Sequence, residues 1–176
     1  IDPNDWDLIL TSPLSRARAT AEIVAEVNGF ADAEVEPLLL ERSFGEAEGM
    51  SHQEWLAKYA DTNSVPGGES LRDLEGRANL LLDQLAMKFR GRRILAVSHG
   101  ALIRILLRIV SNGEFPREGE RLGNASMSVF AHDGSIWRIR VSLTASVTAV
   151  RDLTQIIKAY DVRGVYPDQL DAELGG

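Results

Sequence analysis

The sequence predicts an α/β fold, a three-layer sandwich around a mostly parallel sheet, and three observations lead to that class. Short apolar segments alternate along the chain with segments of helical periodicity, as in folds whose strands are joined by covering helices. Residues 94–97 are apolar without alternation, which is typical of a strand buried on both faces. Two apolar segments lead directly into helical patterns, at Ser12 and at His99. The length of 176 residues suits one medium domain.

The elements of the first half follow from local signals. Residues 6–10 are predicted to form a short strand, and Ser12 is expected to cap a helix that has Pro13 in its first position. Gly29 is expected to end that helix. A serine followed three residues later by a glutamate, at residues 51–54, has the spacing of a capping box and predicts a short second helix.

The second half continues the alternation and then changes composition. Residues 70–89 have a helical apolar face, residues 101–110 form another helix, and two strands flank the tight turn at Asp133-Gly134. Residues 143–152 are rich in small and polar residues without a clear period, so they are predicted to be a linker. The expected division is therefore a domain over 1–142, this linker, and a separate segment over 153–176.

Composition excludes several classes of function. A formal net charge of −7 argues against nonspecific nucleic-acid binding, which needs an excess of Lys and Arg. The chain has no cysteine, and its three histidines lack the spacing of zinc ligands, so no metal site is expected. No apolar run is long enough to cross a bilayer, and the acidic start does not fit a signal peptide. We expect a cytoplasmic protein with neither a nucleic-acid nor a membrane partner.

Five short motifs occur in a fixed order. They are Ser12–Ala21 (S-x-L-x-R-A-x-x-T-A), Leu40–Gly49 (L-E-R-S-F-G-E-A-E-G), Pro66–Ser70, Ser98-His99-Gly100 and Asn124-Ala125-Ser126. Together they resemble the histidine phosphatase superfamily, which includes phosphoglycerate mutases and acid phosphatases. The resemblance covers residues 5–142 and implies a phosphoglycerate mutase-like sandwich without its first strand. It also implies hydrolysis or transfer of phosphoryl groups on small phosphate esters, with no cofactor.

The resemblance also implies roles for individual residues. Arg16, His99 and Gly100 would bind the phosphoryl group, and Glu41 would act as the acid or base at the leaving oxygen, with Glu46 as the rival carboxylate. Asn124 and Ser126 are tentative further phosphate contacts. The family histidine that His99 matches acts best when it is protonated, although a helix N-terminus favours the neutral imidazole.

The family's nucleophilic histidine is missing. It belongs to an R-H-G motif after the first strand, and no R-H-G occurs in this sequence, whose first residue is Ile1. His52 and His132 are expected on the surface, outside any such motif. We therefore expect the sequence to open inside a longer reading frame and to lack phosphohistidine chemistry as given. Loss of an interior strand would leave its neighbours unpaired, so the chain is also expected to be unstable.

The C-terminal segment has a second, shorter resemblance. Residues 153–172, which contain the run K-A-Y-D-V-R-G-V-Y-P at 158–167, are similar to the start of the α-D-phosphohexomutases, phosphomannomutase and phosphoglucomutase. This resemblance leaves open a fusion fragment with an isomerase, and the missing nucleophile leaves open a noncatalytic phosphate-binding module. A compensating strand would favour the module, and the sequence does not reveal one. Tyr160 and Arg163 match phosphohexomutase positions but are expected to have no role without that family's serine.

Overall fold

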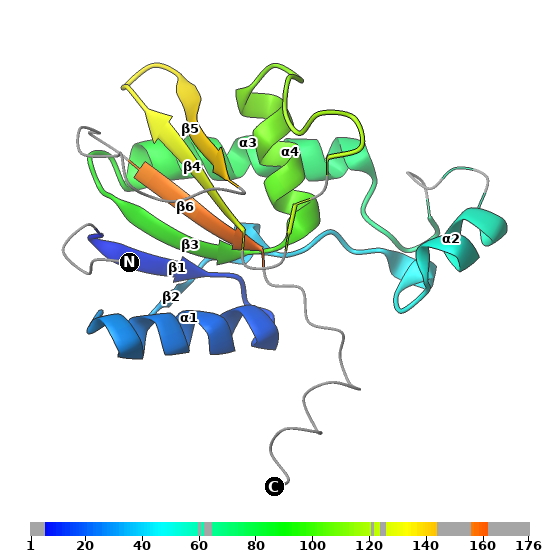
Figure 1. Ribbon diagram of the computed structural model, residues 1–176, viewed down its shortest axis with the longest axis horizontal. Helices are drawn as coiled ribbons and strands as arrows, with labels where there is room; N and C mark the ends of the chain where they lie inside the picture. Colours follow the sequence, from blue (N-terminus) through cyan, green and yellow to red (C-terminus); the bar gives the residue numbers. More distant parts are fainter. Residues whose placement is uncertain are drawn as a thin grey trace, which may run out of the picture.

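The computed structural model describes residues 6–59, 61, 65–120, 122–123, 126–143 and 156–161 (Figure 1). The α-helices are α1 (Ser15–Asn28), α2 (His52–Lys58), α3 (Leu71–Lys88) and α4 (Gly100–Val110), and two short 3-10 turns are η2 (Pro37–Leu39) and η3 (Gly45–Ala47). The strands are β1 (Leu8–Thr11), β2 (Glu34–Val35), β3 (Ile94–Ser98), β4 (Met127–His132), β5 (Trp137–Leu143) and β6 (Ile156–Asp161).

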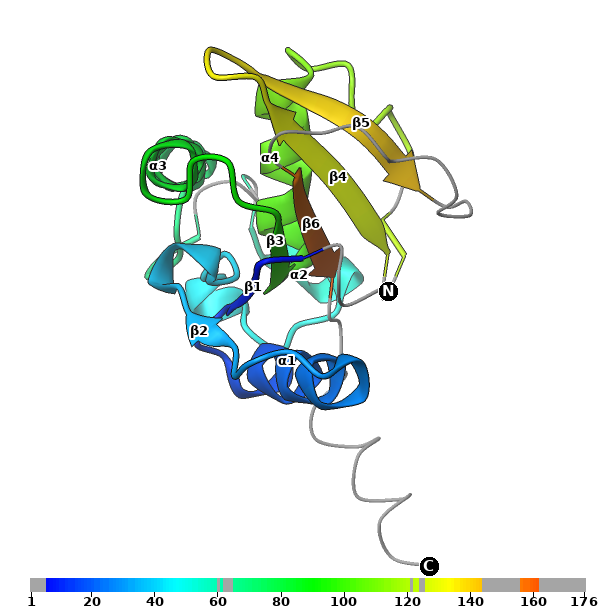
Figure 2. The same ribbon diagram turned by 90° about the vertical axis from the view of Figure 1, so that its left-hand side faces the viewer.

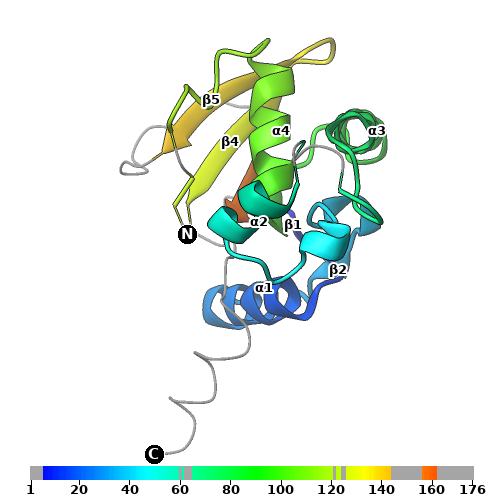
Figure 3. The ribbon, with the colours of Figure 1, turned by 90° about the vertical axis from the view of Figure 1, so that its right-hand side faces the viewer.

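The strands form one mixed sheet in the order β2-β1-β3-β6-β4-β5. The first four strands of this order are mutually parallel, whereas β4 is antiparallel to both β6 and β5. Helix α1 covers one face of the sheet, and α3 and α4 cover the other (Figures 2 and 3). The predicted three-layer α/β sandwich is confirmed.

Strand β3 shows how the sequence builds these layers. All five of its residues are buried, as the unbroken apolar run predicts. Because successive side chains of a strand point to opposite faces, Ile94 and Ala96 join the core under α3 and α4. Leu95 and Val97 pack into the second core, under α1. The strand therefore holds both layers together and fixes the residues that follow it at the sheet's edge.

Several predicted boundaries are confirmed and one is wrong. Gly29 ends α1 with φ +67°, a left-handed conformation that glycine adopts without strain. Ser51 and Glu54 form the predicted capping box at the start of α2, and the hairpin turn lies at Asp133-Gly134 as expected. The helix predicted to begin at Pro13 instead begins at Ser15, and no side chain caps it.

Strand β6 corrects another expectation. It pairs in parallel with β3 from Ile94↔Ile157 to Ser98↔Asp161, and antiparallel with β4 on its other side. The sequence alone does not predict this compensating strand, because the segment resembles the start of another family. The inner edges of β3 and β4 are paired, so the premise of the expected instability is wrong. Arg163 and the rest of the C-terminal segment lie outside the described residues.

Candidate functional site

His99 lies where β3 gives way to α4, in the N-cap position of that helix, and is fully buried. Its ring Nε2 is 2.8 Å from the hydroxyl oxygen of Ser12. Ser12 directly follows β1, and Thr11 of β1 is paired with Val97 of β3. The carboxyl ends of these parallel strands therefore meet at one edge of the sheet, which is where α/β proteins bind ligands.

Ser12 does not cap the first helix as predicted. Its Oγ accepts a hydrogen bond of 3.3 Å from the backbone N–H of Leu14, ahead of the helix, and contacts His99. This contact orients the imidazole. The other ring nitrogen, Nδ1, is buried and has no hydrogen-bond partner within the described part of the chain. Because an unsatisfied buried polar atom costs about 1–3 kcal/mol, such an atom marks a place where a polar ligand would be favourable.

The surroundings of His99 disfavour its charged form. Burial, followed by the positive charges of Arg16 and Arg77, lowers its pKa to about 4. The imidazole is therefore neutral at pH 7. An anion placed between these charges would act in the opposite direction and raise the pKa.

Arg16 is exposed in the first turn of α1, and its charge reaches His99. Among the described residues, its guanidinium makes no hydrogen bond or ion pair with a side chain or carbonyl. Its five N–H donors are therefore available for a planar, bidentate contact with an anion. Arg18 lies two positions further along α1, lining a hollow of about 620 Å³ together with Glu22, Glu26 and Phe30. Neither Arg16 nor His99 lines that hollow.

Glu41 reaches the same edge from the loop after η2. Its Oε1 accepts hydrogen bonds from the backbone N–H of Ala101, at 3.2 Å, and of Arg42, at 2.9 Å. Ala101 is in the first turn of α4, immediately after His99 and Gly100, and its N–H is one of those that the helix cannot satisfy itself. The carboxylate also interacts favourably with the positive end of the helix dipole.

The rival carboxylate lies elsewhere. Glu46 in η3 accepts a hydrogen bond from the Tyr59 hydroxyl at 3.1 Å and pairs with Lys58 at 3.7 Å, and its side chain is 60% exposed. These partners belong to α2 and the residue after it. The structure thus brings Glu41 to the helix that begins beside His99, and holds Glu46 on the surface.

The remaining predicted residues divide between the two edges of the sheet. Ser126 directly precedes β4, at the same edge as His99 but two strands away, since Met127 pairs with Tyr160 and Tyr160 with Val97. Asn124 lies outside the described residues. His132 ends β4 at the opposite edge, where its ring packs against Trp137. His52 is the first residue of α2, and its side chain is not described.

Sequence reasoning missed Arg77, whose charge acts on His99. A signal was present, because Arg77 lies on the predicted apolar face of its helix, three residues after Leu74 and four before Leu81. A charged residue at such a position needs polar partners inside the protein. No cluster of three or more metal-ligating side chains is found within the residues described, and none of their helices is long and apolar enough to span a bilayer.

Comparisons with known proteins match this chain to one family and to several relatives. The sequence model "Histidine phosphatase superfamily (branch 1)" matches residues 1–143. The chain is 37% identical over 135 residues to the uncharacterized phosphatase PhoE of Bacillus subtilis, covering 77% of this chain and 69% of that protein. It is 32% identical over 145 residues to phosphoglycerate mutase-like protein 4 of Arabidopsis thaliana, covering 76% of this chain and 62% of that protein.

Solved structures share the fold. A mycobacterial glucosyl-3-phosphoglycerate phosphatase, determined with inorganic phosphate, superimposes with a TM-score of 0.64 at 27% identity, over 80% of this chain and 79% of that one. YhfR of Bacillus stearothermophilus gives a TM-score of 0.67 at 22% identity, over 81% of this chain and 76% of that one.

Proposed function

Because the chain belongs to the histidine phosphatase superfamily (branch 1), we propose that it is a phosphoryl-binding domain for small phosphate monoesters. The observation that carries the proposal is the convergence of His99, Ser12 and Glu41 at one edge of the sheet, with the charge of Arg16 acting on His99. These groups come from three separate segments of the chain, around Ser12 and Arg16, Glu41 and His99. Their meeting at a helix N-terminus suits a tetrahedral anion.

Arg16, His99 and the first turn of α4 would share the oxygens of the phosphoryl group. Arg16 supplies a fixed positive charge and a bidentate fork. The N–H of Gly100 adds a helix-terminal donor, and the orphaned Nδ1 of His99 is a further polar contact. A bound dianion raises the proton affinity of His99, so substrate binding itself would favour the imidazolium, which donates from both ring nitrogens.

Glu41 is proposed as the acid or base at the ester oxygen, in preference to Glu46. Its carboxylate is held next to the α4 terminus, where an ester oxygen would lie beside a phosphoryl group bound there. In general acid–base catalysis the catalytic group must lie within hydrogen-bond reach of the oxygen that it protonates. The Glu41 carboxylate accepts a hydrogen bond from the N–H of Ala101 at the start of α4, which supports this assignment, whereas Glu46 is committed to Tyr59 and Lys58.

The 176-residue chain contains no R-H-G sequence and therefore no residue in the family's nucleophile context. Neither of the other histidines substitutes for it, since His132 is at the far edge of the sheet and His52 begins the outlying helix α2. We propose that this form binds phosphate esters without turnover through a phosphohistidine. Strand β6, which completes the sheet, favours such a noncatalytic module.

The test is a calorimetric titration with inorganic phosphate, joined to an assay of hydrolysis of a generic aryl phosphate. Binding of one phosphate per chain without turnover is expected. Arg16→Met should weaken binding at least tenfold, because it removes about the free energy of one charge-assisted hydrogen bond. Arg18→Met is the matched control, because Arg18 lies on the same helix outside the site. Absence of phosphate binding would refute the site, and hydrolysis above background would refute the noncatalytic form.

A further inference from the structure

The loop that carries Glu41 has little regular structure of its own. Between η2 and η3, residues 40–44 belong to neither a helix nor a strand. Backbone carbonyls in such a segment need donors from elsewhere. The position of the Glu41 carboxylate therefore depends on which side chains hold this loop.

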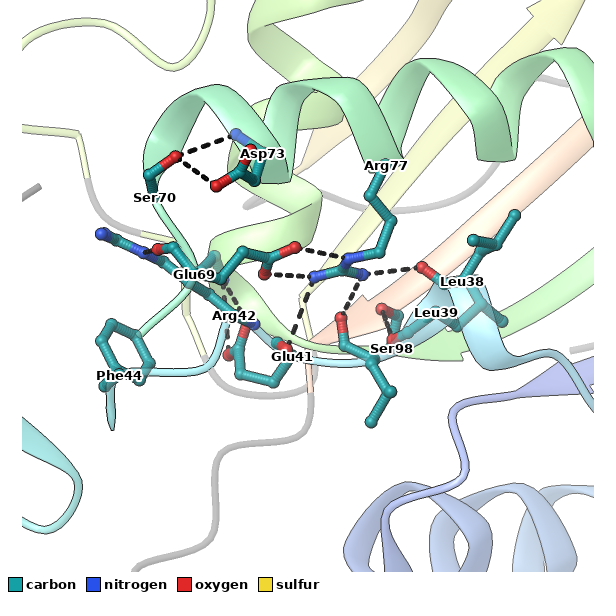
Figure 4. Close-up of polar contacts among 12 residues, drawn as sticks. Leu38, Leu39, Glu41, Arg42, Phe44, Glu69, Ser70, Asp73, Arg77 and Ser98 are labelled. Atoms are coloured by element: carbon teal, nitrogen blue, oxygen red, sulfur yellow. Dashed lines mark hydrogen bonds and ion pairs between the residues drawn. The ribbon is translucent and has the colours of Figure 1, made fainter. Parts of the chain in front are cut away.

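Arg77 of α3 supplies donors to the start of this loop (Figure 4). Its Nη1 donates to the carbonyl oxygens of Leu38, at 2.9 Å, and Leu40, at 2.8 Å. Its Nη2 reaches the carbonyl oxygen of Glu41 at 3.5 Å. One guanidinium thus holds three carbonyls within four consecutive residues, ending at Glu41 itself.

Glu69 fixes the guanidinium from the other side. Its two carboxylate oxygens accept from Nε of Arg77 at 2.8 Å and from Nη2 at 2.7 Å, a bidentate pair. Together with the three carbonyl contacts, this pair engages all three nitrogens of the guanidinium. The two side chains are only 17% and 18% exposed, so solvent screens the pair weakly.

The backbone of Glu69 extends the same support past Glu41. Its N–H donates to the carbonyl oxygen of Ser43 at 2.8 Å, and its own carbonyl accepts from Nε of Arg42 at 2.9 Å. On the sheet side, the Ser98 hydroxyl donates to the Leu39 carbonyl at 2.8 Å. The loop is therefore tied on both sides of Glu41, and one of these ties is the residue directly before His99.

We propose that Arg77 and Glu69 are a positioning pair, which sets the distance between the Glu41 carboxylate and the start of α4 beside His99. The proposal rests on the function assigned to Glu41 above. Neither residue of the pair needs to touch the phosphoryl group. A lysine cannot replace Arg77, because an ammonium group has three donors and no planar fork for five contacts.

Amide hydrogen exchange tests the pair independently of any activity. The Ala101 N–H has no acceptor within its own helix and is protected through the Glu41 carboxylate. In Arg77→Lys, and in the milder Glu69→Gln, its protection is expected to fall roughly tenfold or more, while that of Ile103, bonded to the His99 carbonyl, stays as in wild type. Arg93→Lys, which alters the Asp7–Arg93 pair, is the matched control and should leave both amides unchanged.

A double-mutant cycle with inorganic phosphate adds a functional readout. Glu41→Gln removes a negative charge beside the bound dianion and should tighten phosphate binding several-fold in the wild-type background. In the Arg77→Lys background the carboxylate is no longer held there, so the same change should have a smaller effect.

Three results would overturn the positioning role. The first is unchanged protection of Ala101 in both variants, and the second is an equal loss of protection at Ala101 and Ile103. The third is an equal effect of Glu41→Gln on phosphate binding in both backgrounds. If wild type binds no phosphate, the proposed function fails, and the exchange measurement still decides the role of the pair.

Discussion

Acid should destabilise this protein through His99. The folded state holds the imidazole neutral with a pKa of about 4, whereas the unfolded chain has the ordinary value of 6.5. Between these pH values the unfolded state binds a proton that the folded state does not, so the free energy of unfolding decreases as the pH falls. Each pH unit costs about 1.4 kcal/mol, which gives at most about 3 kcal/mol between neutral pH and pH 4.

The measurement is a series of urea unfolding curves between pH 7.5 and pH 4, for wild type and for His99→Gln. Carboxylates titrate in both proteins, so the difference between the two curves isolates the histidine. Wild type should lose up to about 3 kcal/mol more than the variant over this range. His132→Gln is the control, since it removes a histidine at the opposite edge of the sheet from His99, and an effect equal to that of His99→Gln would count against the assignment.

Phosphate should shift the pKa of His99 in the opposite direction from burial. A dianion bound beside Arg16 and His99 favours the imidazolium, so saturating phosphate should reduce the extra acid sensitivity of wild type. Parallel pH curves for wild type and His99→Gln, without phosphate, would refute the account of a buried neutral imidazole.

Two further predictions concern the fold. Ala159→Pro, in the middle of β6, removes a backbone N–H from a strand that is paired on both sides. The free energy of unfolding should fall by about 3 kcal/mol, which lowers the thermal midpoint by roughly 10 °C. An unchanged thermal midpoint would place β6 outside the sheet. Gly45→Ala should destabilise by several kcal/mol in chemical denaturation, because its Cβ would overlap the backbone of Pro66 and Gly68 at a positive φ. Gly49→Ala also has a positive φ but meets nothing within 4 Å, so it should cost only about 1 kcal/mol, and equal losses at the two glycines would count against the overlap.

The sequence was sufficient for those parts of the fold that local patterns determine. Strand β3, the capping box at Ser51 and the turn at Asp133-Gly134 depend on residues near one another, and all were predicted. The start of α1 was wrong because Ser12 satisfied the rule for a helix cap, while its hydroxyl instead bonds a loop amide and contacts a histidine from a distant segment. The contact with His99 therefore outweighs the preference of Ser12 for the helix N-cap.

The candidate site could also be predicted only in part, where local sequence determines it. The approach of Glu41 to the start of α4 is consistent with its predicted role, which the phosphate experiments test. The support by Arg77 and Glu69 was missed, since its hydrogen bonds reach carbonyls, and carbonyls carry no signature in the sequence. The position of β6 was missed because strand partners depend on pairing across the sheet, which a similarity confined to one segment does not reveal.

The place of β6 also bears on how the molecule assembles during synthesis. The ribosome releases β1, β3 and β4 well before β6, yet β6 separates β3 from β4 in the finished sheet. Until β6 emerges, the nascent polypeptide presents two open edges that chaperones or other chains could occupy. Completion of the sheet must therefore wait for β6, and slowing synthesis just ahead of residue 156 would lengthen the time that those edges remain available.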